Sequence, residues 1–296
     1  MQNHRWAPIR YVPIAIAAVA AIAWHRAPRP AVPPHELTIV ARDYTFDAPD
    51  SIAAGVTTIR LQNRGPNLHH LTIVRLDSGH TTEEFMAAIE HAGFGDSPWP
   101  SWITYFGGPN APVPGAEATA TVDLAPGHYL ITCFVHSPDS ATHAMVSHVV
   151  KGMVHPITVT GPHQPAALPR ADVTVTLADY GFTFSHPLTA GKQVIRVRNT
   201  AAQPHEIFIG RLAPGKVVGD LPKFVVHPYG PPPVVPLGGM TPISHGVDAN
   251  IIIDLPPGEY GVYCYLPDAT DGKPHIDHGM MRQITVGEVV AKNPAR

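Results

Sequence analysis

Apolar and polar residues alternate along several stretches of this chain. Residues 59–62, 173–178 and 195–198 each carry an apolar side chain at every second position, with mostly polar side chains between. A period of two is the pattern of a β-strand that buries one face and exposes the other. These stretches therefore predict half-buried strands.

The segment Asp-Leu-x-Pro-Gly-x-Tyr occurs twice and separates such stretches in both places. A Pro-Gly pair between two apolar runs is a turn signal. We therefore expect two tight antiparallel turns, one joining residues 119–124 to 129–134 and the other joining 251–255 to 260–265.

One segment has a helical pattern instead. Phe85, Met86 and Ile89 have the spacing of one face of a helix, and Thr81 and Glu84 have the spacing of a capping box. We therefore expect a helix over residues 82–92.

The chain contains two copies of one pattern. Cys133 corresponds to Cys264 and Gly107 to Gly238, both 131 residues later, whereas the earlier Asp43 corresponds to Asp179, 136 residues later. No segment as helical as residues 82–92 occurs in the second copy. Two units of about 120 residues, each long enough for its own core, predict an all-β fold of two tandem Greek-key β-sandwich domains.

The predicted domains are residues 35–160 and 171–288. Residues 161–170 contain three prolines and no periodicity, which is typical of a linker, and residues 289–296 form a tail. Residues 1–34 are interpreted as an N-terminal signal peptide or anchor followed by a Pro-rich linker.

The N-terminus has the pattern of an export signal. Arg5 and Arg10 precede an apolar run over residues 11–24. This run is shorter than the roughly 20 residues of a membrane-spanning helix. A secretory signal cleaved near the Ala-Ile-Ala at 21–23 is the favoured interpretation, and an uncleaved membrane anchor is the alternative. In both cases the folded part is expected in the periplasm or outside the cell.

Composition supports the all-β class and excludes two kinds of partner. The chain has 34 Pro and 25 Gly, too many helix breakers for a helical bundle, and 44% hydrophobic residues, enough for packed cores. A net charge of -3 provides no basic surface for nucleic acid or for anionic lipids. The 19 histidines are unusual, because histidine is the commonest metal ligand.

Each copy ends with a cysteine, a histidine and a methionine in the same order. Cys264 is followed after ten residues by His275, and Cys133 after fourteen by His148; a methionine follows after four more residues in both copies. A further histidine lies six positions after an asparagine upstream. Two imidazoles, a thiolate and a weak thioether are the ligands of a trigonal copper site. The predicted ligands are His205, Cys264, His275 and Met280, and then His69, Cys133, His148 and Met153.

Neighbouring residues compete for these places. His70 follows His69, and only one of two strand neighbours can face the site; the repeat favours His69. Downstream, the competing residues are His136, His143 and Met145 in the first copy and His278 and Met281 in the second. A purely structural interpretation is the alternative, in which the cysteines and methionines only fill the hydrophobic core. A disulfide between the cysteines is not expected, because they hold equivalent positions in separate units.

Both copies resemble cupredoxin domains, the blue-copper family of plastocyanin, azurin and the domains of copper nitrite reductase and multicopper oxidases. The resemblance lies in the upstream Asn63 to His69 and Asn199 to His205 spacing, and in the cysteine, histidine, four residues, methionine order downstream. It extends over residues 36–287 apart from the linker. The long cysteine-to-histidine gap departs from the usual family pattern.

The resemblance implies a copper protein that cycles between Cu(I) and Cu(II), with one ion per domain, and transfers single electrons to redox proteins or a membrane electron-transfer chain. Nitrite reductases and oxidases carry a histidine beside the copper cysteine, whereas Thr132 and Phe134 flank Cys133, and Tyr263 and Tyr265 flank Cys264. We therefore expect an electron carrier rather than an enzyme. A copper carrier or store without a redox role is a second hypothesis, and a copper-free interaction module is a third.

Overall fold

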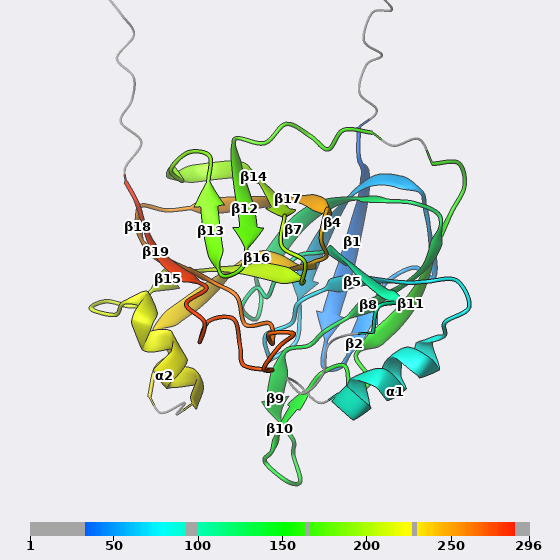
Figure 1. Cartoon of the computed structure of the whole chain (residues 1–296), viewed down its shortest axis with the longest axis horizontal. Coiled ribbons are helices and arrows are strands. Elements are labelled where there is room, and N and C mark those ends of the chain that lie inside the picture. The colour runs from blue at the N-terminus through cyan, green and yellow to red at the C-terminus, as the bar shows by residue number, and fades with distance from the viewer. Residues whose placement is uncertain (1–32, 93–99, 164–165, 227–229, 288–296) are drawn as a thin grey trace, which may run out of the picture. The chain divides into compact units, whose positions relative to one another are not determined.

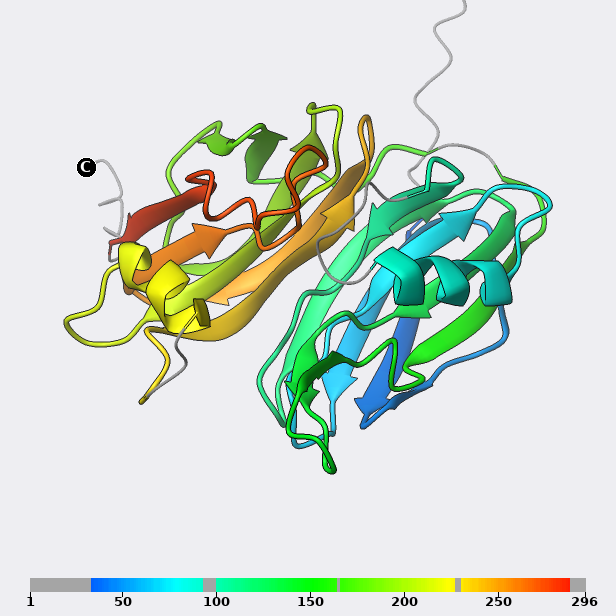
Figure 2. The same ribbon diagram turned by 60° about the horizontal axis from the view of Figure 1, so that its bottom comes forward.

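A computed structural model describes residues 33–92, 100–163, 166–226 and 230–287. The predicted signal or anchor and the predicted tail lie almost entirely outside the described residues. Within them the chain folds mainly into two large β-sheets (Figure 1, Figure 2). The prediction of an all-β sandwich is confirmed, whereas the Greek-key connectivity and the division into two domains stay predictions.

In the described part of the chain, one sheet has eight strands and one has nine, and both contain strands of both copies. The eight-stranded sheet has the order β13 (Gly181–Phe184), β12 (Val173–Ala178), β14 (Gly191–Asn199), β17 (Asp248–Leu255), β7 (Glu117–Leu124), β4 (Gly55–Asn63), β1 (His35–Arg42) and β2 (Thr45–Asp47). The nine-stranded sheet has the order β19 (Met281–Val286), β18 (Gly258–Tyr263), β15 (His205–Leu212), β16 (Val234–Ile243), β6 (Ile103–Gly107), β5 (Thr72–Leu76), β8 (Gly127–Thr132), β11 (Val154–Thr160) and β3 (Ser51–Ala53). A separate pair is β9 (His136–Pro138) with β10 (Met145–Ser147).

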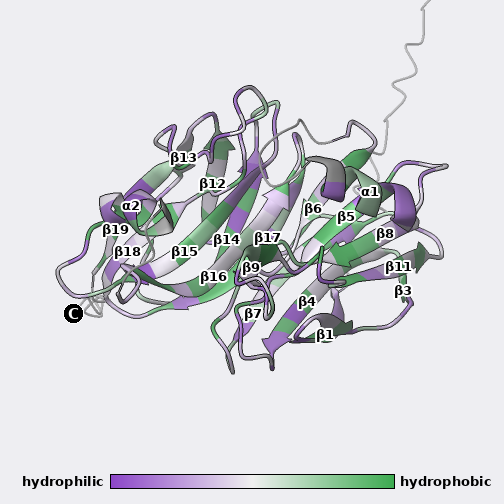
Figure 3. Ribbon diagram, turned by 90° about the horizontal axis from the view of Figure 1, so that it is seen from below, coloured by the Kyte–Doolittle hydropathy of each residue, from purple (hydrophilic) through white to green (hydrophobic). Residues whose placement is uncertain are grey.

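The predicted strand alternation is confirmed. In β12 the apolar positions are buried and the intervening ones are not, and Ile59 and Leu61 of β4 are buried on either side of the exposed Arg60. Ile59 packs in one core cluster with Ile73 of β5, so apolar faces of both sheets contribute to that core. Figure 3 shows the polar and apolar stretches along these strands.

The two predicted antiparallel turns are wrong. The Pro-Gly segments join β7 to β8 and β17 to β18, but in each case the first strand belongs to the eight-stranded sheet and the second to the nine-stranded sheet. Tyr129 Oη donates to the Ala125 carbonyl at 2.9 Å, and Tyr260 Oη to the Pro256 carbonyl at 2.5 Å. These bonds close a corner between sheets, as a tyrosine corner does in other sandwiches.

The predicted helix and its cap are confirmed. Helix α1 spans Thr82–Ala92; the Glu84 N–H donates to Thr81 Oγ1 at 3.2 Å, and the Thr81 N–H to Glu84 Oε2 at 3.0 Å. Its buried Phe85 and Ile89 pack in a second cluster with residues of β5, β6 and β8.

The equivalent part of the second copy is less helical than α1, as the sequence indicated. It contains a 3-10 turn, η1 (Val218–Asp220), followed by the short helix α2 (Leu221–Val226). Pro222 lies in the first turn of α2, where its missing N–H costs no hydrogen bond. None of the helices in the described part of the chain has the length and apolar character needed to cross a bilayer.

The two copies pair through equivalent residues. Ala120 of β7 lies opposite Ile251 of β17, and Pro109 lies opposite Met240, and each pair is separated by the repeat offset of 131. Antiparallel pairing of a residue with its own equivalent is what a two-fold relation between the copies produces.

The second glycine of each repeated Gly-Gly pair permits a close backbone approach within its own copy. A Cβ on Gly108 (φ +144) would lie 2.1 Å from the Leu71 carbonyl oxygen, and one on Gly239 (φ +135) would lie 1.9 Å from that of Ile207. Glycine is therefore required at both positions for the backbones to approach.

Candidate metal centres

Both cysteines directly follow a strand of the nine-stranded sheet. Cys133 comes after β8 and Cys264 after β18, and both are buried free thiols. Their backbone N–H groups donate to the carbonyls of Met153 at 3.2 Å and Met280 at 3.1 Å. Each methionine backbone therefore lies beside the cysteine of its own copy.

In the first copy the structure brings His69, Cys133 and His148 together, which we call the first centre. The two histidine Nδ1 atoms are 3.1 Å apart, and His148 Nδ1 lies 3.5 Å from Cys133 Sγ. The donor atoms of all three residues lie within 4.8 Å of one another, and the three side chains are fully buried.

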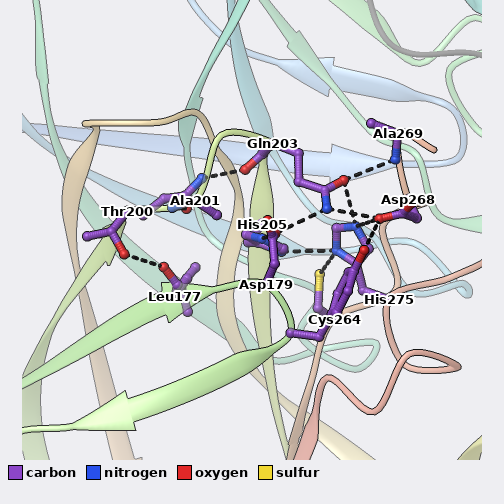
Figure 4. A network of polar contacts seen from close by, with 12 residues as sticks. Leu177, Asp179, Thr200, Ala201, Gln203, His205, Cys264, Asp268, Ala269 and His275 are labelled. Carbon is purple, nitrogen blue, oxygen red and sulfur yellow. Dashed lines mark hydrogen bonds and ion pairs between the residues drawn. The ribbon is translucent and has the colours of Figure 1, made fainter.

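In the second copy His205, Cys264 and His275 form an equivalent cluster, the second centre (Figure 4). The two Nδ1 atoms are 3.0 Å apart, and His275 Nδ1 lies 3.3 Å from Cys264 Sγ. All three residues are fully buried. His69 and His148, 79 residues apart, and His205 and His275, 70 residues apart, therefore converge in the same way in the two copies.

The two predicted methionine ligands lie next to these clusters. Met153 and Met280 are fully buried in the same core cluster as the cysteines. Their N–H groups donate to the carbonyls of His148 at 2.8 Å and His275 at 2.9 Å. The backbone thus places each methionine beside both downstream ligands, and the thioether as a fourth ligand stays a prediction.

The competing residues have different surroundings. His70 Nε2 accepts the N–H of Phe134 at 2.7 Å, so His69 rather than His70 belongs to the cluster. Met145 is 61% exposed, and His143 is exposed too. Of the remaining competitors, His136 is the first residue of β9 and Met281 is the first residue of β19. His278 stacks on the Tyr180 ring.

An aspartate lies behind the upstream histidine of each centre. His69 Nε2 is 2.5 Å from Asp43 Oδ1, and His205 Nε2 is 2.6 Å from Asp179 Oδ1. A carboxylate at Nε2 favours the tautomer with its proton there and leaves the Nδ1 lone pair free for a metal. These aspartates were not among the predicted site residues, although the repeated Asp-Tyr pair at 43–44 and 179–180 was a signal for them.

Burial keeps the imidazoles neutral and the thiols protonated. Burial and the neighbouring imidazole lower the pKa of His148 and of His275 to about 4. Burial raises the pKa of Cys133 to about 12 and also raises that of Cys264. A metal that binds a thiolate must therefore displace one proton at each centre.

The donors of each centre fit a copper ion. Metal–ligand bonds of roughly 2.0–2.3 Å to three donors around one ion place those donors roughly 3.5–4 Å apart. In each centre the downstream Nδ1 atom lies 3.0 to 3.5 Å from the other two donors, and all three donors lie within 4.8 Å of one another, so a metal requires only a small adjustment. Two imidazoles and a thiolate, with a methionine nearby, are the donor set of blue-copper sites.

Neither a protein-family model nor a curated protein matches the sequence. Among solved structures the chain is similar to reduced auracyanin from Roseiflexus castenholzii, with 18% identity over 43% of this chain and 97% of that chain and a TM-score of 0.29. It is also similar to blue copper oxidase from Nitrosomonas europaea, with 16% identity over 88% of this chain and 89% of that chain and a TM-score of 0.24. At such low values these similarities add nothing about function, and the centres are interpreted from their own residues.

Proposed function

We propose that this chain is an exported, cupredoxin-like copper protein that transfers single electrons and holds one copper ion in each centre. The observation that carries the proposal is the convergence, in both copies, of two imidazole Nδ1 atoms and one thiol Sγ below the surface. Copper bound there supplies a one-electron couple between Cu(I) and Cu(II). The partners we propose are periplasmic or membrane redox proteins.

The surroundings of the donors support an electron carrier. The N–H groups of His70 and Glu206 donate to the sulfur atoms of Cys133 at 3.4 Å and Cys264 at 3.5 Å. Aspartate carboxylates hold the upstream histidines from behind. Donors that are held by hydrogen bonds move little when the charge of the metal changes, and fast electron transfer requires such small movement.

Addition of Cu(II) to the purified protein tests the proposal. Two equivalents are expected to produce an intense visible thiolate-to-copper absorption band. Cys133→Ser and Cys264→Ser should each remove one centre's contribution, and the double variant should remove the whole band. A band that survives in the double variant would contradict the ligand assignment. Binding of Cu(I) without a band would instead support a copper carrier or store, and absence of copper binding would support an interaction module.

Histidine variants provide matched controls. His148→Ala and His275→Ala are expected to abolish the band of the first and the second centre. His143→Ala and His245→Ala remove histidines outside both clusters and should leave the spectrum unchanged. Export is tested separately by cell fractionation of the full chain, and accumulation in the cytoplasm would contradict it.

A further inference from the structure

The groups behind the downstream histidine differ between the two centres, although they occupy equivalent positions. Ser137 and Asp268 each lie four residues after the cysteine, and Lys151 and His278 each lie three residues after the downstream histidine. The first centre therefore has a hydroxyl and a cation where the second has a carboxylate and an imidazole.

In the first centre a cation is held behind His148. Ser137 Oγ lies 3.0 Å from His148 Nε2. Lys151 Nζ donates to Ser137 Oγ at 2.8 Å and to Tyr44 Oη at 3.1 Å, and it lies 4.7 Å from the centre of the Tyr44 ring. The carbonyls of Ser137 and Pro138, both at 3.0 Å, complete its contacts. The ammonium group is thus one hydroxyl away from the imidazole.

In the second centre a carboxylate, that of Asp268, lies behind the downstream histidine His275 (Figure 4). Gln203 Oε1 lies 3.1 Å from His275 Nε2, and Asp268 Oδ2 lies 3.8 Å from the same nitrogen. Asp268 Oδ2 also accepts hydrogen bonds from Tyr180 Oη at 2.5 Å and Gln203 Nε2 at 2.9 Å. Asp268 is 4% exposed. Burial acts to raise the pKa of Asp268, but these hydrogen bonds hold it below its usual range, so the carboxylate is charged at neutral pH. His278 stacks on Tyr180 with ring centres 4.7 Å apart.

The other nearby charges do not reverse this difference. A carboxylate lies behind the upstream histidine in both centres, so it cancels in a comparison. Asp139, at the surface, acts on Lys151, and Asp271 pairs with Lys273 at 3.4 Å and with His278 at 3.1 Å. Solvent screens such outer charges more than the buried Asp268.

We infer that the first centre favours Cu(I) and the second favours Cu(II). In a protein that holds one Cu(I) and one Cu(II), the Cu(I) is therefore at the first centre. This inference rests on the proposed function. Oxidation adds one positive charge to a centre, which a buried carboxylate stabilises and a nearby ammonium destabilises. In the transfer the second centre is oxidised from Cu(I) to Cu(II) and the first is reduced from Cu(II) to Cu(I), with no bond or proton exchanged.

Proteins with a single centre test the difference directly. Cys264→Ser keeps the first centre and Cys133→Ser keeps the second. Two readouts are used: the midpoint potential, from the absorption band titrated against redox mediators, and the Cu(I) affinity, from competition with a coloured chelator. The first centre is expected to prefer Cu(I) over Cu(II) at least about tenfold more than the second, which corresponds to ~59 mV for one electron.

The equivalent positions allow matched exchanges. In the first-centre protein, Ser137→Asp with Lys151→His should lower the preference for Cu(I) about tenfold or more. In the second-centre protein, Asp268→Ser with His278→Lys should raise it by a similar factor. Lys216→His makes the lysine-to-histidine change at an exposed position outside both centres, and it should change the preference less than about twofold.

The outcomes separate this inference from the proposed function. If neither single-centre protein develops the band, the proposed function is wrong. If both develop it but the second centre favours Cu(I) as strongly as the first, or the exchanges leave the order unchanged, the inference is overturned and the proposed function stands. Circular dichroism checks the fold, and Lys151→Gln and Asp268→Asn replace any double variant that does not fold, with the same expected directions.

Discussion

Glu206 accepts a hydrogen bond from the N–H of Tyr265 at 3.0 Å, immediately after Cys264. His70, its equivalent in the first copy, accepts the N–H of Phe134 at 2.7 Å. The residue next to each upstream histidine therefore ties down the backbone that follows the cysteine. In the second copy this function is performed by a buried acid, which has consequences for stability.

Glu206→Gln is expected to stabilise the metal-free protein at alkaline pH. Glu206 is 3% exposed, and burial raises its pKa from 4.5 to about 7. The folded state therefore holds this proton more firmly than the unfolded state, so the stability contributed by the neutral acid is present below pH 4.5 and is lost as the pH rises through 7. The gain at about pH 8 should reach up to about 3 kcal/mol.

Urea unfolding at about pH 5 and about pH 8 measures this gain, which should be larger at the higher pH. Glu36→Gln, at an exposed glutamate, is the control and should have little effect. Equal gains at both pH values would show that ionisation of Glu206 is not the cause.

Asp43→Asn and Asp179→Asn are expected to weaken metal binding at the first and the second centre by about 10- to 100-fold. Each removes the carboxylate that faces the Nε2 atom of an upstream histidine, at His69 and His205. Chelator competition in single-centre proteins is the measurement. Asp254→Asn, at an exposed aspartate on β17, is the control. Unchanged affinity would mean that the aspartates do not orient the imidazoles.

The metal-free protein is expected to lose stability as the pH falls from 6.5 to about 4. The pKa of His148 and of His275 is lowered from 6.5 to about 4 by burial and by the neighbouring imidazole. The unfolded state binds these protons more readily, so stability contributed by the neutral rings is present above pH 6.5 and is lost as the pH falls. Glu206 has the opposite effect, but the buried histidines outnumber it.

Thermal unfolding of the metal-free protein across this pH range is the measurement. His148→Phe should reduce the slope of stability against pH, whereas His143→Phe, at an exposed position, should not. A slope that stays the same in His148→Phe would contradict the assignment.

Gly239→Ala is expected to destabilise the pairing of β16 with β15 in the second copy by more than about 2 kcal/mol. Its φ is +135, and the added Cβ would meet the Ile207 carbonyl oxygen at 1.9 Å. Gly246→Ala is a matched control, because Gly246 also has a positive φ, +75, but no atom lies within 4 Å of its Cβ position. It should cost only the conformational strain, about 1–2 kcal/mol. Equal losses in a urea titration would show that the close approach does not matter.

Local signals made much of the fold predictable. The Thr81 and Glu84 capping pair and the apolar face of residues 82–92 specify α1 by contacts within one or two turns, so the structure agrees with them. The period of two identified buried and exposed faces in β4 and β12. The two turns were predicted wrongly because the local Pro-Gly signal is the same in both possible cases. It does not tell whether the strand that follows joins the same sheet as the strand before it or the facing sheet.

The candidate centres were predictable because the chain is duplicated. Cysteine, histidine and methionine recur in the same order, and the repeat alone was enough to prefer His69 over His70. The sequence by itself therefore determined the strands, the first helix and the identity of the candidate ligands, since all of these depend on spacing along the chain.

Only the tertiary structure decided what surrounds those ligands. Asp43 lies 26 residues from His69, and Tyr44 lies 93 residues from Ser137, yet both pairs are in hydrogen-bond contact. The charge difference between Lys151 and Asp268 becomes meaningful only once the loops place both groups behind an imidazole. The alternation of apolar and polar residues indicates that one face of a strand is buried but not which residues cover it. The effect of a charge on a metal centre depends on its distance in space rather than on its position in the chain.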